Sequence, residues 1–123
     1  MTSAMTALRL IPLPVHGALE MLLGFFVMAS PFALGLSAPA TVVGVMMGTL
    51  LVGLALAAVD VETEGRRPLA IAAHHSFDYA LVTGMLGAAV ILGMAGDRVA
   101  ATLFAAVALL QLALNMTTKY SHR

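Results

Sequence analysis

The chain has 123 residues, of which 61% are hydrophobic and only 10% are charged, whereas soluble domains carry about 25% charged residues. This composition excludes a water-soluble globular protein and indicates an integral membrane protein. The formal net charge of zero gives no sign of nucleic-acid binding, and the absence of cysteine excludes disulfides and thiolate metal sites.

Four apolar segments follow one another along the chain, at roughly 10–35, 40–59, 69–95 and 98–117. Each is near the length of about 20 residues that crosses the hydrocarbon core of a bilayer. The first is too long for the apolar region of a cleaved signal peptide, so we expect it to be a retained transmembrane helix. The predicted fold is therefore all-α, with four transmembrane helices.

The second half of the chain repeats the first 58 residues later and without a gap, so that His16 aligns with His74 and Glu20 with Asp78. We expect a single membrane domain over residues 1–123, made of repeat one at about 10–59, a polar linker at about 60–68 and repeat two at about 69–117. Because each repeat has two spans, the repeats are parallel and form two tandem helical hairpins.

The basic residues predict the orientation in the membrane. In an up-down arrangement, Arg98 lies on one side, and the other side carries Arg9, Arg66, Arg67, Lys119 and Arg123. The positive-inside rule then places both termini and the linker in the cytoplasm, and we expect a multi-pass protein of a bacterial cytoplasmic (inner) membrane.

The end of the first segment resembles the SPW-repeat family of small bacterial integral membrane proteins. Ser30-Pro31-Phe32, followed by Leu34-Gly35, matches the family's Ser-Pro-Trp motif, with Phe in place of Trp. Repeat two is degenerate, since it has Ala88-Ala89-Val90 at this position and keeps only Leu92-Gly93. The resemblance implies paired membrane helices and brings no established activity.

The Ser-Pro motif also predicts a local structure of its own. Pro31 should kink or end the first helix because proline removes a backbone hydrogen bond, and Ser30 can cap the groups that are left free. Gly44-x-x-x-Gly48 in the second segment is a small-residue pattern that suits close helix packing, either within the chain or in a homo-oligomer.

Two His-x-x-x-acid pairs are the candidate functional residues. His16 with Glu20, and His74 with Asp78, are spaced i,i+4 and so lie on one face of each helix. Ionisable groups at membrane depth usually face the bundle interior, and the repeat brings both pairs to one depth. We therefore expect a cluster of two histidines and two carboxylates between the first and third helices.

Four interpretations of this cluster stay open. The favoured one is a hydrogen-bonded polar cluster that holds the hairpins together. The others are a divalent-metal site for Zn, Fe or Mn, a proton or ion relay, and bis-histidine ligation of haem b by His16 and His74. Gln111 and Asn115 form a second polar stripe on the fourth helix, for which interhelical hydrogen bonding is expected.

The absence of a nucleophile elbow, a phosphate loop and a zinc-protease motif argues against an enzyme. The leading functional hypothesis is a non-enzymatic membrane protein with a structural, scaffold or protein-interaction role, without a cofactor. The alternative is metal-ion or proton binding or transport through His16, Glu20, His74 and Asp78. Expected partners are the lipid bilayer and either further copies of the chain or other membrane proteins.

Overall fold

A computed structural model describes residues 10–57 and 71–119. Its regular elements within these ranges are four long helices: α2 (Leu13–Ala33), α3 (Ala38–Ala57), α4 (Ile71–Met94) and α5 (Arg98–Thr117). All four are long and apolar enough to cross a membrane. The predicted all-α fold with four transmembrane helices is therefore confirmed. The predicted linker at 60–68 lies outside the described residues, as do four of the basic residues used for the orientation: Arg9, Arg66, Arg67 and Arg123.

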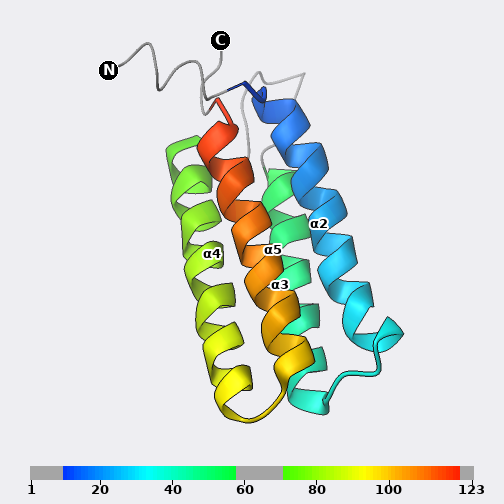
Figure 1. Ribbon diagram of the computed structural model, residues 1–123. Helices are drawn as coiled ribbons and strands as arrows, with labels where there is room; N and C mark the ends of the chain where they lie inside the picture. The colour runs from blue at the N-terminus through cyan, green and yellow to red at the C-terminus, as the bar shows by residue number, and fades with distance from the viewer. Residues whose placement is uncertain (1–9, 58–70, 120–123) are drawn as a thin grey trace.

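The helices pair as two antiparallel hairpins, α2 with α3 and α4 with α5, and the hairpins meet along α3–α4 and α2–α5 (Figure 1). In this arrangement α2 and α4 lie diagonally across the bundle, one from each hairpin. The beginnings of α2 and α4 lie at the same end of the bundle as the end of α5, which is the upper end in Figure 1.

Proline and glycine set the helix boundaries. Pro14 lies in the first turn of α2, where its missing N–H has no helical acceptor in any case. Each hairpin turn contains a glycine with positive φ, Gly35 at 61° and Gly96 at 90°, a conformation that other residues rarely adopt. These two glycines reverse the chain direction between the spans.

Pro31 lies inside α2, which ends two residues later at Ala33. The freed end of the helix is closed by backbone groups, because the N–H of Leu34 donates to the carbonyl of Ser30 and that of Leu36 to the carbonyl of Pro31, both at 2.9 Å. The buried Ser30 hydroxyl has no hydrogen-bond partner among the described residues. The prediction that the Ser30 side chain caps this end is therefore wrong, because the last carbonyls of α2 accept from backbone N–H groups of the turn.

The first hairpin packs closely through glycines. Gly24 of α2 and Gly48 of α3 face each other, and a Cβ atom on Gly48 would lie 2.5 Å from the Gly24 carbonyl oxygen. Gly44 adjoins Pro31 of the same hairpin and the ring of Phe104 from the other. The Gly44-x-x-x-Gly48 pattern therefore serves packing within the chain.

The repeat contains a shift that the gapless alignment misses. Buried positions of α2 recur in α4 after 58 residues, as in His16 and His74, but those of α3 recur in α5 after 60, as in Leu51 and Gln111. The helix α4 has 24 residues against 21 in α2, and the second turn is one residue shorter than the first. The structural counterparts of Gln111 and Asn115 are thus Leu51 and Ala55.

The two turns are joined to each other at the end of the bundle opposite the termini of the described chain. The Asp97 side chain caps α5 by accepting from the N–H of Ala100 at 3.1 Å. Its other oxygen accepts a hydrogen bond from the Ser37 hydroxyl at 2.7 Å. One carboxylate therefore both begins α5 and connects the two hairpins.

Replacing Asp97 with alanine should lower the free energy of unfolding by about 1 kcal/mol, the usual effect of losing a helix cap. Thermal unfolding in detergent, followed by circular dichroism, measures this change. The control is Thr102→Ala, which removes an exposed hydroxyl that donates only to Arg98 of its own helix. Equal losses in the two variants would contradict a role for Asp97 in joining the turns.

Candidate functional site

A buried cluster of two histidines and two carboxylates lies between the first two turns of α2 and the first two turns of α4. We call His16, Glu20, His74 and Asp78 the His/carboxylate cluster. One ligating atom of each residue lies within 4.8 Å of all the others, and all four side chains are buried. The structure thus brings together, from both hairpins, the four residues that the sequence singled out.

Asp78 contacts both histidines with a single oxygen atom. Its Oδ2 atom lies 3.0 Å from Nε2 of His16 and 3.2 Å from Nε2 of His74. The first contact joins α4 to α2, whereas the second is the expected i,i+4 contact within α4. The Asp78 carboxylate therefore bridges the two imidazole rings.

Glu20 lies between the same two rings. Its Oε1 is 3.3 Å from Nε2 of His74, and its Oε2 is 3.5 Å from Nε2 of His16. Imidazole and carboxylate therefore alternate around a closed ring of four groups. Its sides are 3.0–3.5 Å long, and each residue contacts one partner on its own helix and one on the diagonal helix.

The polar stripe of α5 adds a second layer behind Glu20. The amide nitrogen of Gln111 donates to Oε2 of Glu20 at 2.8 Å and to Oδ1 of Asn115 at 3.0 Å. Both amide side chains are fully buried. Gln111 thus makes an interhelical hydrogen bond and fixes the orientation of the Glu20 carboxylate.

Thr118, which the sequence reasoning missed, orients His16 from the other side. Its hydroxyl oxygen lies 2.6 Å from Nδ1 of His16 and also 2.6 Å from the carbonyl oxygen of Leu114. A hydroxyl has one hydrogen, and the Leu114 carbonyl can only accept it. The hydroxyl oxygen must then accept from His16, so Nδ1 carries the hydrogen and Nε2 faces the cluster with its lone pair or with a second proton.

The backbone holds Thr118 in place. The N–H of Ile11 donates to the carbonyl of Thr117 at 2.9 Å, and the N–H of Lys119 donates to the carbonyl of Ile11 at 2.8 Å. This short parallel bridge fastens the residues before α2 to the end of α5. Thr118 lies three residues after Asn115 and seven after Gln111, so helical spacing was the signal that would have found it.

Charge balance limits what the cluster can hold. Two buried carboxylates carry a charge of −2, and uncompensated charge is very costly in a buried, membrane-embedded site. Two protonated histidines neutralise it, and so does one divalent cation with both histidines neutral. The two states differ in what occupies the space between the four groups.

The same geometry argues against haem. In bis-histidine haem the two imidazoles lie on opposite faces of the porphyrin, which fills the plane between them. Here the carboxylates of Glu20 and Asp78 lie in that space, within 3.5 Å of the imidazole nitrogens. The ring centroids of His16 and His74 are only 5.7 Å apart, with an interplanar angle of 69°.

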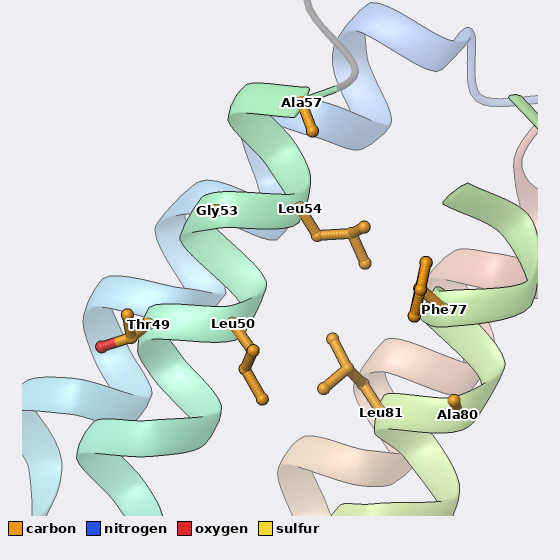
Figure 2. Close-up of a pocket in the computed structure, with 8 residues that line it drawn as sticks. All are labelled: Thr49, Leu50, Gly53, Leu54, Ala57, Phe77, Ala80 and Leu81. Atoms are coloured by element: carbon orange, nitrogen blue, oxygen red, sulfur yellow. The ribbon is translucent and has the colours of Figure 1, made fainter. Parts of the chain in front are cut away.

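A separate apolar pocket of about 440 Å³ lies between α3 and α4, on the side of the bundle where the hairpins meet (Figure 2). Leu54 and Phe77 extend toward each other across it. The hydroxyl of Thr49, at its edge, already donates to the carbonyl of Val45 at 2.7 Å. The pocket therefore offers a ligand apolar contact and no free polar group, and it is distinct from the His/carboxylate cluster.

A scan against protein-family models, a search of curated proteins and a search of solved structures found no match to this chain. The resemblance to the SPW-repeat family stays a prediction from the motif. The geometry of the His/carboxylate cluster is the feature of the molecule that bears on its function.

Proposed function

We propose that this protein is a non-enzymatic multi-pass membrane protein with a structural, scaffold or interaction role, in which the His/carboxylate cluster holds the two hairpins together. One observation carries the proposal. The contacts of His16 with Asp78 and of His74 with Glu20 both join α2 to α4, the diagonal pair that contributes one helix from each hairpin. A buried polar contact of this kind selects one pairing of otherwise similar apolar helices.

The closed form of the cluster supports a structural role over a catalytic one. A catalytic imidazole or carboxylate must lie within reach of a substrate or water, and catalytic zinc centres keep one coordination position open for it. In this cluster each imidazole Nε2 faces carboxylate oxygens of both acids at 3.0–3.5 Å. The same closure favours static binding over ion transport, because an ion in transit must leave its ligands.

The exposed surface supports lipid and protein partners. Large apolar side chains are exposed on all four helices, among them Phe25, Met46, Ile91 and Leu110. In a bilayer these side chains face acyl chains, further copies of the chain or other membrane proteins. We place the protein in a bacterial cytoplasmic membrane with both termini inside because most of its Lys and Arg residues fall on that side of the four spans.

A double-mutant cycle tests the proposed role of the cluster. His16→Ala and Asp78→Ala remove the two sides of an inter-hairpin contact, so their effects on the free energy of unfolding should be non-additive by about 0.5–3 kcal/mol. Unfolding in mixed detergent micelles measures each corner of the cycle. The control pairs His16→Ala with Thr83→Ala, an exposed position of α4.

Additive effects in the first cycle would show that the contact does not hold the hairpins together. Turnover of a substrate by the purified protein, lost in the His16→Ala variant, would contradict the non-enzymatic part of the proposal. The non-additivity should appear in the first cycle and be absent from the control cycle.

A further inference from the structure

The four residues of the His/carboxylate cluster lie close to the spacing that a tetrahedral metal ion requires. Zinc binds histidine nitrogen and carboxylate oxygen at about 2.0–2.2 Å, which places neighbouring ligand atoms about 3.3–3.6 Å apart in a tetrahedron. The four imidazole–carboxylate contacts measure 3.0, 3.2, 3.3 and 3.5 Å, with Glu20 presenting Oε1 to His74 and Oε2 to His16. One ligating atom from each of the four residues lies within 4.8 Å of the other three. Small side-chain movements would bring all four atoms to one ion.

Two of the facing atoms are not satisfied by hydrogen bonds. His74 Nε2 and Glu20 Oε1 lie 3.3 Å apart and are buried, yet neither has a hydrogen-bond partner among the described residues. An imidazolium would direct its N–H along the line to one acceptor oxygen. A ring nitrogen that faces the space between two carboxylates instead suits a ligand placed between them.

The surrounding residues supply part of the outer shell of a metal site, for His16 and Glu20, whereas Nδ1 of His74 has no hydrogen-bond partner among the described residues. Metal-bound histidine usually donates its other ring N–H to a fixed acceptor, and metal-bound carboxylates accept hydrogen bonds from outer residues. Thr118 accepts from Nδ1 of His16, which leaves Nε2 for coordination, and Gln111 donates to Glu20. A divalent ion also cancels the charge of the two carboxylates while both histidines stay neutral.

We propose that the His/carboxylate cluster binds one divalent transition-metal ion of the zinc class, through Nε2 of His16 and His74 and one oxygen each of Glu20 and Asp78. The inference rests on the proposed function, because the ion would be the link between the hairpins. Two nitrogen ligands in a four-residue shell favour zinc-like ions over calcium, which takes six to eight oxygens. Four protein ligands make a closed, structural site.

Metal analysis of the full chain in mild detergent tests this inference. After removal of metal with a chelator and addition of Zn²⁺, elemental mass spectrometry should find about one ion per chain, as expected for a single four-ligand site. Co²⁺ in its place should give the intense visible absorption of a tetrahedral complex. His74→Gln should lose both signals, and His75→Ala, which removes the neighbouring histidine outside the cluster, should keep them.

A second variant tests the site without removing a ligand. Thr118→Val keeps the shape of the side chain but removes the acceptor for His16, so the affinity for Zn²⁺ should fall about 10- to 100-fold. Thr118→Ser should restore most of the affinity because it restores the hydroxyl. Competition with a chromophoric chelator measures all three proteins, and circular dichroism checks that each is helical.

The outcomes separate this inference from the proposed function. Folded wild-type protein that takes up neither Zn²⁺ nor Co²⁺, or uptake that is unchanged in His74→Gln, would overturn the metal site. Non-additivity between His16→Ala and Asp78→Ala in that metal-free protein would leave the structural role intact, with protonated histidines as the link. Stoichiometric metal without such non-additivity would overturn the structural role and keep the metal site.

Discussion

Replacing Asp78 with alanine is expected to destabilise the folded protein by about 3–5 kcal/mol, the usual effect of removing one partner from a buried charged pair. The effect is large because Oδ2 of Asp78 contacts both imidazoles, at 3.0 and 3.2 Å. Its loss leaves the Glu20 carboxylate as the only acid facing two histidines. The remaining side chains are buried, so the charge that is left without a partner is poorly solvated.

Denaturation of the purified protein in mixed micelles, followed by circular dichroism, measures the loss. Asp78→Asn should fall between wild type and Asp78→Ala, because the amide keeps the shape and one acceptor oxygen but not the charge. The control is Ser76→Ala on the same helix, whose exposed hydroxyl donates only to the carbonyl of Ala72. An Asp78→Ala variant as stable as Ser76→Ala would refute a role of the cluster in stability.

Gly48→Ala is expected to cost about 1–3 kcal/mol or more, because the added methyl group overlaps a backbone atom rather than a flexible side chain. The new Cβ would lie 2.5 Å from the carbonyl oxygen of Gly24 and would also collide with Met28. The carbonyl cannot move unless α2 and α3 separate. Separation would in turn displace α2, which carries His16 and Glu20.

The same helix offers a matched control. Gly53→Ala adds the same methyl group to α3 where no atom lies within 4 Å, so it should be neutral or stabilise the helix by up to about 1 kcal/mol. Both variants are compared with wild type by thermal unfolding in one detergent. Similar losses in the two would mean that glycine at these sites matters for helix propensity and not for the close approach of α2 and α3.

The four spans were predictable because hydropathy and turn chemistry are local properties of the chain. The predicted segments 10–35, 40–59, 69–95 and 98–117 correspond to helices at 13–33, 38–57, 71–94 and 98–117. The prediction of Ser30 as a cap failed because helix capping is not a local property of the chain. Whether a side chain or the backbone satisfies a freed group depends on how the turn closes, which one residue type does not reveal.

The four residues of the cluster were also readable from the sequence, since i,i+4 spacing places His16 with Glu20 and His74 with Asp78 on one helix face each. The sequence also showed the polar stripe of Gln111 and Asn115 on α5, but it did not show that Gln111 donates to Glu20 of α2. The gapless alignment pairs Gln111 and Asn115 with Gly53 and Ala57, whereas their structural counterparts are Leu51 and Ala55. The alignment could not detect the two-residue shift between α3 and α5.

The sequence by itself determined the membrane class, the number of spans, the pairing into hairpins and the residue types available to the site. Only the tertiary structure decided that Glu20 and Asp78 close a ring around both histidines, that Gln111 supports Glu20 and that Thr118 orients His16. The physical reason is that the direction of each side chain rotates around the helix axis along the sequence. A helix turns by about 100° per residue, so the faces that meet across a bundle depend on turn lengths and on close contacts such as Gly24 with Gly48.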